Sequence, residues 1–286
     1  MFSYKTLEAI DDRILHQTFV SAFSDYQIKM DLPPWKLQQM LSRRGYIPEK
    51  SMGVFKEETL VGFILNGYRE WEGKTTVYDT GTGVVPEYRK QGLTTNMFRK
   101  VMELLRVHGV KQYLLEVLQQ NTSAYELYRK QGFEITRSFS CFKLDKCNYK
   151  YQNSFGIEQV DGFTAAEWEG LKEFWDFQPS WQNSIDSVCV LPEDFIYSVV
   201  RCDNKIVGYG IIEKRTGDIP QICVDKNYRH KGFGRSIMAE LVKNTEANRA
   251  AVINVDDKAE VFKEFLNNFG FENYVQQYEM ILEINT

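Results

Sequence analysis

The sequence lacks a long apolar segment, a basic excess and paired cysteines. No apolar run approaches the ~18 residues needed to span a bilayer, and charges among the first twenty residues argue against a secretory signal. The net charge of −4 argues against nucleic-acid binding, which usually needs a basic face. The five scattered cysteines contain no Cys-x-x-Cys pair, so neither a disulfide framework nor a metal site is expected. These absences predict a cytoplasmic protein with no metal and no membrane or nucleic-acid partner.

Two common nucleotide-binding motifs are also missing. There is no Gly-x4-Gly-Lys-Ser/Thr loop, and the pair Gly81 and Gly83 lacks the third glycine of a dinucleotide-binding fingerprint. At 286 residues, with 43% hydrophobic residues, the chain is long enough for two domains that each bury a core.

The same order of elements occurs in both halves. An extended run ending at Val85 leads into an Arg-x-x-Gly loop and a helix, and a run ending at Val224 does the same. Gly132 lies as far after Val117 as Gly270 lies after Val255. Such matches in one order indicate a duplication. We predict two tandem α/β (α+β) domains, at 1–146 and 154–286 with a linker at 147–153. Each should have a mixed, mostly antiparallel sheet with helices on both faces.

The Arg-x-x-Gly loops are suited to phosphate. A strand that turns into a helix directs free backbone N–H groups and the positive end of the helix dipole at one point. Gly92 and Gly232 would let a pyrophosphate approach the backbone. Arg89 and Arg229 add positive charge nearby. The alternative is an ordinary strand-to-helix turn with a solvated basic rim.

Two motifs carry a family resemblance. Val-x-Pro-x-x-Arg-x-x-Gly before a helix, and the later Asn-x-x-Ala-x-x-Leu-Tyr-x-x-x-Gly-Phe that starts at Asn121, resemble the GCN5-related N-acetyltransferase (GNAT) superfamily. The resemblance implies that the loop holds the pyrophosphate of acetyl-CoA, that the strand before it meets the pantetheine arm, and that Asn121 orders a turn or bonds that arm. The implied cofactor residues are Val84, Val85, Arg89, Lys90, Gln91, Gly92, Leu93, Thr94 and Asn121 in the first domain, and Val224, Arg229, Gly232 and Gly234 in the second.

Glu116 and Tyr128 are the candidate catalytic residues. Their spacing with Asn121 resembles the branch of the superfamily that acetylates the N-termini of ribosomal proteins, which implies a base at Glu116 and an acid at Tyr128. A free tyrosine has a pKa of about 10, which suits protonation of a departing thiolate. Tyr128 could instead be ordinary helix packing and Glu116 an ion-paired strand residue. Asp79 is a second candidate base.

The second domain differs at the aligned positions. Asn254, Ala259 and Leu266 replace Glu116, Asn121 and Tyr128. Its loop is the more regular one, with Gly234 where the first domain has Thr94. We therefore expect a non-catalytic support or substrate-shaping domain that still binds CoA.

The sequence supports three hypotheses about function. The first is an acetyl-CoA-dependent N-acetyltransferase, a monomer or homodimer, acting on a primary amine of a small molecule, peptide or protein. The others are a non-catalytic CoA or acyl-CoA sensor and a transferase of another acyl group. Four aromatic residues could line the acceptor channel or pack in the core: Phe19, Phe23, Tyr26 and Trp35.

Overall fold

The structure is a computed structural model that describes residues 1–25, 32–148 and 155–284. Tyr26 and residues 149–153 of the predicted linker lie outside the described residues. The strands are β1 (Phe2–Thr6), β2 (Met52–Lys56), β3 (Thr59–Trp71), β4 (Lys74–Val84), β5 (Gln112–Leu118), β6 (Glu134–Asp145), β7 (Glu158–Val160), β8 (Phe195–Cys202), β9 (Lys205–Glu213), β10 (Gln221–Val224), β11 (Arg249–Asp256) and β12 (Glu272–Glu283).

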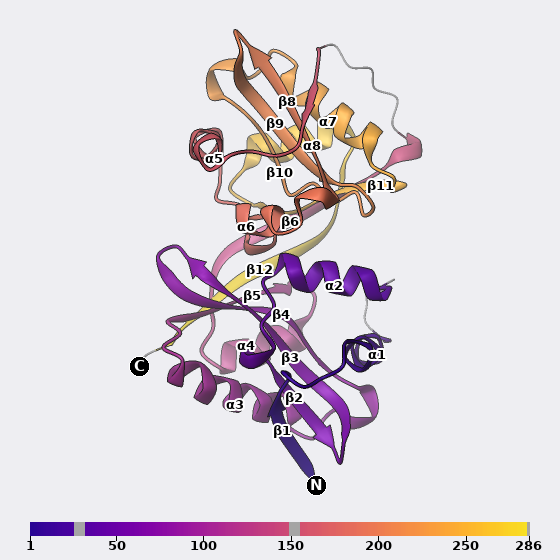
Figure 1. Cartoon of the computed structure of the whole chain (residues 1–286), viewed down its shortest axis with the longest axis vertical. Coiled ribbons are helices and arrows are strands. Elements are labelled where there is room, and N and C mark those ends of the chain that lie inside the picture. The colour runs from indigo at the N-terminus through magenta and orange to yellow at the C-terminus, as the bar shows by residue number, and fades with distance from the viewer. Residues whose placement is uncertain (26–31, 149–154, 285–286) are drawn as a thin grey trace. The chain divides into compact units, whose positions relative to one another are not determined.

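The α-helices are α1 (Asp12–Ala22), α2 (Pro34–Arg43), α3 (Leu93–Val107), α4 (Thr122–Lys130), α5 (Ala165–Lys172), α6 (Ile185–Cys189), α7 (Phe233–Asn244) and α8 (Glu260–Phe269). The short 3-10 helices are η1 (Pro48–Lys50), η2 (Pro86–Tyr88), η3 (Lys146–Asn148), η4 (Trp181–Asn183), η5 (Pro192–Asp194) and η6 (Lys226–Tyr228). The two halves repeat the order strand, loop, helix, strand, helix, strand, starting at β4 in the first half and at β10 in the second, as predicted (Figure 1).

The chain forms two compact units whose limits differ from the predicted domain boundaries. The first unit contains residues 1–117, 123–136 and those from Glu279 onward, and the second contains 118–122 and 137–278. The strand order of the larger sheet is β1-β2-β3-β4-β5-β12-β6-β11, so the closing strand β12 pairs beside β5. Strand β6 pairs antiparallel with β11, with Leu144 opposite Ala250. Strands β6 and β12, the last strand of each half, therefore each contribute residues to both units. The reason is that the order of strands in the sheet does not follow their order in the chain.

The first unit has helices on both faces of its strands. Helix α1 begins at Asp11, whose carboxylate accepts a hydrogen bond from the Arg13 N–H at 2.8 Å. Together α1 and α2 bury an apolar cluster against β3 that includes Leu15, Phe19 and Phe63. The amphipathic helix α3 covers the other face (Figure 1).

The aromatic residues near α1 mostly build this core. The rings of Phe19 and Phe63 stack with centroids 5.3 Å apart, and Phe23 lies 4.7 Å from Phe19. Trp35 is half-buried on α2. For Phe19 and Phe23, core packing is therefore the role that the contacts support.

The second unit packs α7 across its own antiparallel sheet, which has the order β10-β9-β8-β7. A Cβ on Gly210 would lie 2.6 Å from Ile237 and 2.7 Å from Leu241, so this glycine lets the helix approach the strand closely. Helix α8 ends at its C-cap residue Gly270, which has φ +110°, a left-handed conformation that favours glycine.

Candidate active site and cofactor loops

The first loop joins β4 to α3 through η2. Gly92 is the N-cap residue of α3 with φ +73°, and no side chain caps the helix. The first N–H groups of a helix have no partner within it, so those of α3 are available to a ligand. A Cβ on Gly92 would meet nothing within 4 Å, which means that its left-handed backbone, rather than crowding, requires glycine.

The second loop repeats this backbone. Gly232 caps α7 with φ +91°, again without a side-chain cap. Lys90 and His230, each two positions before its glycine, both have φ 61°. Two unconnected stretches therefore adopt one conformation in which successive N–H groups are turned toward the helix start.

The arginine of the first loop forms hydrogen bonds to the strand before it and to the end of α1. The guanidinium of Arg89 donates to the Val84 carbonyl at 2.9 Å and to the Ala22 carbonyl at 2.7 Å. It also forms two bonds to the Asp25 carboxylate, at 2.6 and 2.9 Å. These contacts tie the loop to the end of α1.

Arg229 makes the same set of contacts in the second unit. It donates to the Val224 carbonyl at 3.0 Å, to the Phe174 carbonyl at 2.9 Å and to Asp176 at 2.8 Å. The sequence suggested that both arginines bring charge to a phosphate. In the structure their guanidinium groups bond to these carbonyls and carboxylates and hold the loop.

Val84 and Val85 also have part of their backbone engaged. Val85 donates to the Val61 carbonyl at 2.9 Å and accepts from the Tyr88 N–H at 2.9 Å. Each carbonyl still has a second lone pair for a ligand. Of the other loop residues, Leu93 is buried, Thr94 is half-buried, and Lys90 and Gln91 are exposed.

Strands β4 and β5 part close to the candidate catalytic residues. Their parallel pairing runs from Thr76 opposite Gln112 to Tyr78 opposite Leu114. Asp79 is the next residue of β4 after Tyr78, and Glu116 lies two residues after Leu114 on β5. Such a split between parallel strands leaves backbone groups unpaired, which is where a ligand can enter the sheet.

Tyr128 of α4 contacts Asp79 across this split. Its hydroxyl donates to Asp79 Oδ2 at 3.0 Å, and the Thr82 hydroxyl donates to the same oxygen at 2.8 Å. The Tyr128 ring packs edge-on against Phe133, with centroids 5.6 Å apart. The residue predicted as the acid is thus held beside the second candidate base.

The environment of Asp79 favours its neutral form. Its Oδ1 is covered from solvent and has no hydrogen-bond partner among the described residues. Burial raises the pKa of Asp79 above its usual range, while bonds from Thr82 and Tyr128 oppose that rise. A carboxyl group with a raised pKa, beside a tyrosine at a gap in the sheet, is typical of a proton-transfer site.

Glu116 and Asn121 have other contacts. Glu116 interacts with the buried hydroxyl of Tyr78, and burial followed by the charge of Glu116 raises the pKa of that tyrosine. The backbone N–H of Asn121 donates to the Leu118 carbonyl at 2.9 Å in the turn before α4.

The aligned positions of the second unit are structural. Asn254 is 1% exposed, donates to Ser180 Oγ at 3.0 Å and accepts from Gln277 at 2.8 Å. Leu266 is fully buried in the core. Neither side chain can exchange a proton near neutral pH, so the groups required for acid–base chemistry are missing at these aligned positions.

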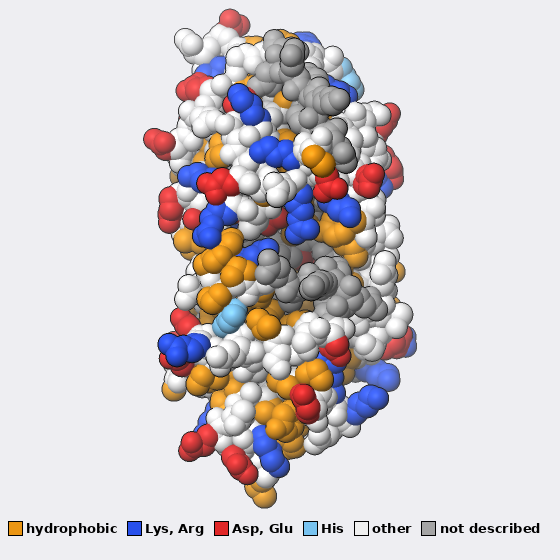
Figure 2. Space-filling view, turned by 90° about the vertical axis from the view of Figure 1, so that its right-hand side faces the viewer, with side chains coloured by type: hydrophobic (Ala, Val, Ile, Leu, Met, Phe, Trp, Pro, Cys, Tyr) orange, Lys and Arg blue, Asp and Glu red, His pale blue; other side chains and the backbone are white. Residues whose placement is uncertain are grey.

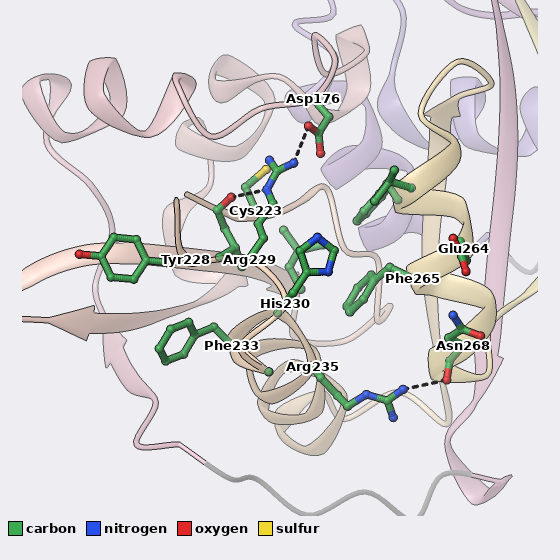
Figure 3. Close-up of a pocket in the computed structure, with 16 residues that line it drawn as sticks. Asp176, Cys223, Tyr228, Arg229, His230, Phe233, Arg235, Glu264, Phe265 and Asn268 are labelled. Atoms are coloured by element: carbon green, nitrogen blue, oxygen red, sulfur yellow. Dashed lines mark hydrogen bonds and ion pairs between the residues drawn. The ribbon is translucent and has the colours of Figure 1, made fainter. Parts of the chain in front are cut away.

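A cavity of about 400 Å³ nevertheless opens beside the second loop. His230 projects from the loop toward Phe265 of α8, and Arg235 reaches Asn268 at 3.1 Å (Figure 3). The walls come from β10, the loop, the start of α7 and α8, and they include Asp176, Ile222, Cys223, Val224, Tyr228, Arg229, His230, Gly232, Phe233, Gly234, Arg235, Val261, Phe262, Glu264, Phe265 and Asn268. All four residues predicted in this domain as cofactor contacts line it.

Several residues that contact the two loops were not predicted from the sequence. Asp25, Asp176 and Cys223 belong to no motif, and their roles depend on partners more than 10 positions away. The only available signal was the duplication, which could have paired the segments after α1 and α5.

The described residues add three observations, on surface charge, on helix length and on metal-binding groups. On the face shown in Figure 2, Lys and Arg side chains are interspersed with Asp and Glu. None of the helices in the described ranges is long and apolar enough to cross a membrane. Within those ranges no three His, Cys, Asp or Glu residues form a group that could hold a metal ion.

Comparisons with known proteins find a family match in each half of the chain. The model of the acetyltransferase (GNAT) family matches residues 15–133, and that of an acetyltransferase (GNAT) domain matches residues 164–280. The chain is 38% identical over 69 residues to GCN5-related N-acetyltransferase 6, chloroplastic, of Arabidopsis thaliana, which covers 24% of each protein. It is 32% identical over 87 residues to thialysine N-epsilon-acetyltransferase of Bos taurus, covering 29% of this chain and 51% of that protein. The chain thus spans at most about half of these relatives.

Solved structures share the fold over the whole chain. A GCN5-related N-acetyltransferase from Sphaerobacter thermophilus has a TM-score of 0.74 at 15% identity, covering 100% of this chain and 96% of that one. A tandem GNAT protein from the clavulanic acid biosynthesis pathway has a TM-score of 0.72 at 14% identity, covering 100% and 99%. With a GNAT match in each half and a shared tandem fold, the chain belongs to the GNAT acetyltransferase family and carries two such domains in tandem.

Proposed function

We propose that the protein is an acetyl-CoA-dependent N-acetyltransferase whose first domain acetylates a primary amine. The observation that carries the proposal is the 3.0 Å hydrogen bond from Tyr128 to Asp79, beside the split between β4 and β5. It joins a hydroxyl that can donate a proton to a carboxyl group that can accept one. The second domain has no such pair at the aligned positions.

The reaction needs two proton transfers. The amine nitrogen forms a bond to the acetyl carbon, the carbon–sulfur bond breaks, the nitrogen loses a proton and the sulfur gains one. Tyr128 is the group proposed to protonate the sulfur. The base is Asp79 or Glu116, the two carboxylates at the split.

Asp79 has an advantage as the base. A proton taken from the amine by Asp79 lies one hydrogen bond from the Tyr128 oxygen, so it can return to the tyrosine after that residue has given its proton away. The pair would then be restored without bulk water. Glu116 interacts with the hydroxyl of Tyr78 instead, and it remains the other candidate base.

The first loop is proposed to hold the cosubstrate. The N–H groups at the start of α3 and the left-handed residues Lys90 and Gly92 suit a pyrophosphate. Val84 and Val85 flank the path of the pantetheine arm. Arg89 supports this loop through its bonds to Asp25 and Ala22 rather than by touching phosphate.

The acceptor class is proposed from chemistry and from a relative. A carboxyl group at the split suits an amine that arrives as a cation, because it can bind the ammonium group and then accept its proton. The thialysine N-epsilon-acetyltransferase of Bos taurus is named for an amine at the end of a flexible side chain. We therefore place thialysine, lysine and alkyl diamines first in the acceptor panel, with N-terminal peptides second.

CoA release from acetyl-CoA across this amine panel tests the proposal. We expect release that requires an amine and falls by ~10²-fold in Tyr128→Phe. Acetyl-CoA that binds without amine-dependent release across the whole panel would instead favour the non-catalytic sensor. Faster release from a longer acyl-CoA would favour transfer of another acyl group.

A further inference from the structure

Strand β4 carries a bulge directly after Asp79. Along β3, Leu65 lies opposite Gly81, whereas the next residue, Asn66, lies opposite Asp79. Thr80 therefore has no opposite residue in this strand pair. A bulge of this kind leaves backbone groups of the extra residue outside the ladder and changes the direction of the side chains beside it. The direction of the Asp79 carboxyl group thus depends on what holds Thr80.

Arg44, the C-cap residue of α2, holds this bulge. Its Nη1 donates a hydrogen bond to the Thr80 carbonyl at 2.8 Å, although 36 positions separate the two residues. Thr80 is 4% exposed, so water has little access to that carbonyl. A buried carbonyl that loses its donor destabilises the fold, because it has given up water without a replacement. The shape of the bulge is therefore coupled to Arg44.

The backbone of Arg44 is fixed against β3. A Cβ on Gly67 would lie 2.0 Å from the Arg44 carbonyl oxygen, so this close approach requires glycine. Tyr46 forms a β-bridge with Gly67, and the Tyr68 N–H donates to the Gly45 carbonyl at 3.0 Å. The side chain of Arg44 therefore starts from a fixed point beside β3 and reaches the next strand, β4.

A buried amide occupies the place opposite Asp79 on β3. Asn66 is 0% exposed, and its side-chain oxygen accepts a hydrogen bond from the Tyr113 hydroxyl at 2.5 Å. Its Nδ2 donates to the Lys50 carbonyl at 2.5 Å, and its backbone N–H donates to the Ser51 hydroxyl at 2.9 Å. These bonds fix a neutral side chain at this place. A charge that acts on Asp79 must therefore come from another element.

Arg44 supplies a positive charge near Asp79. Burial raises the pKa of Asp79, while hydrogen bonds and the charge of Arg44 lower it. The other titratable groups that interact with Asp79 or its neighbours are three tyrosines and one carboxyl group, Tyr78, Tyr113, Tyr128 and Glu116. The tyrosines are neutral near pH 7, and a carboxylate at Glu116 disfavours a second one nearby. Among these groups, Arg44 is the one whose own charge favours an ionised Asp79.

The proposed reaction requires an ionised carboxylate at Asp79. The amine nitrogen gives up a proton, and a carboxylate oxygen forms the new O–H bond with it. A carboxyl group that is already protonated cannot accept this proton. Because burial favours the protonated form, a nearby cation widens the pH range in which Asp79 can act as the base.

We propose that Arg44 is a positioning residue of the first active site, which holds the bulge at Thr80 and keeps the Asp79 carboxyl group ionised for the acceptor amine. Its guanidinium group acts on the reaction through Asp79. The role of Asp79 as the base rests on the proposed function, whereas the bond from Arg44 to the bulge rests on the geometry alone.

Titration of Asp79 in the full chain tests the charge of Arg44 without an activity assay. The carboxyl carbon of Asp79 is followed by NMR in protein labelled at the aspartate side chains, and its signal is identified by its loss in Asp79→Asn. We expect the titration midpoint to move to higher pH in Arg44→Gln and Arg44→Met, and to stay near the wild-type midpoint in Arg44→Lys, which keeps a cation. Arg99→Met removes an exposed arginine of α3 and should leave the midpoint unchanged.

Two results of this titration would overturn the proposal. One is a wild-type midpoint in both Arg44→Gln and Arg44→Met. The other is an equal upward shift in Arg44→Lys, which would mean that the charge does not act on Asp79. If Arg44→Met does not fold, Arg44→Gln and Arg44→Lys still decide, because both keep a hydrogen-bond donor and they differ in charge.

The pH dependence of acetylation tests the link to the reaction. On the acid limb, the kcat of Arg44→Gln should be lower than that of wild type by about 3- to 10-fold. The two values should approach each other at higher pH, where Asp79 is ionised in both proteins, and Arg44→Lys should follow the wild-type profile. A loss of kcat by the same factor at every pH would mean a structural role alone and would overturn the proposal. A shifted midpoint of Asp79 with an unshifted acid limb would overturn it as well.

Failure of the proposed function gives a different result. A protein that releases no CoA with any amine would rule that function out. The titration of Asp79 would still show whether Arg44 controls its ionisation, since that measurement needs no substrate.

Discussion

The hydroxyl of Tyr128 donates a hydrogen bond to Asp79 at 3.0 Å, although 49 positions separate the two residues. Asp79 is the first residue of β4 beyond its pairing with β5 and Tyr128 lies on α4, so their contact depends on how α4 packs over the split in the sheet. The same place in the second domain has a buried leucine and a structural amide. This difference suggests a division of roles between two copies of one fold, and the following predictions test it.

Tyr128→Phe should lower kcat by ~10²-fold and leave the binding of acetyl-CoA nearly unchanged, because it removes one proton and little volume. Steady-state kinetics with calorimetry would check this. Tyr125→Phe, on the same helix, is the matched control and should keep wild-type kcat. Full activity in Tyr128→Phe would rule the tyrosine out as the acid.

Asp79→Asn and Glu116→Gln should separate the two candidate bases. If Asp79 accepts the amine proton, Asp79→Asn lowers kcat by ~10²-fold, and Glu116→Gln has the smaller effect. The wild-type rate should then fall as pH drops through the raised pKa of Asp79. The reverse order of effects, with the acid limb retained in Asp79→Asn, would assign the base to Glu116.

The raised pKa of Asp79 should also make the stability of the fold depend on pH. Between its unfolded value, 3.8, and its higher folded value, the native state binds more protons than the unfolded state. Stability from this group is therefore present at low pH and lost as pH rises through the folded pKa. The melting temperature of Asp79→Asn minus that of wild type should therefore be more positive at pH 8 than at pH 4. A difference that does not change with pH would contradict the shift.

Arg89→Lys should weaken acetyl-CoA binding without removing activity. A lysine ammonium group cannot reach the Val84 and Ala22 carbonyls and bond Asp25 at two points together. We expect the KM for acetyl-CoA to rise about 10-fold, equivalent to about 1.4 kcal/mol, with a smaller change in kcat. Arg99→Lys, in an exposed pair with Glu103 on α3, is the control. An unchanged KM in Arg89→Lys would mean that the loop holds its shape without this arginine.

Two glycine substitutions should have opposite effects on stability. Gly92→Ala forces alanine to adopt φ +73° and should cost about 1 kcal/mol. Gly170→Ala, in the exposed part of α5 with open space around it, should stabilise the fold by about 0.5 to 1 kcal/mol. Urea unfolding of both variants checks the signs. A neutral Gly92→Ala would mean that the loop relaxes away from its left-handed conformation.

Local features were predictable because neighbouring residues determine them. The duplication, the Arg-x-x-Gly turns and the helix end at Gly270 depend on a few consecutive positions and their backbone preferences. Tyr128 and Glu116 were named from a spacing that resembles the family, and Asp79 was named as a second candidate base. The aligned losses at Asn254 and Leu266 also follow from the sequence.

Tertiary structure decided which groups meet. It paired Tyr128 with Asp79, joined Arg89 to Asp25, and placed β12 beside β5. It also brought Trp175, Tyr209 and Gln221 into one chain of hydrogen bonds. Backbone preference acts over a few residues, whereas these contacts join segments that are far apart in the chain and meet only when helices pack and strand edges pair.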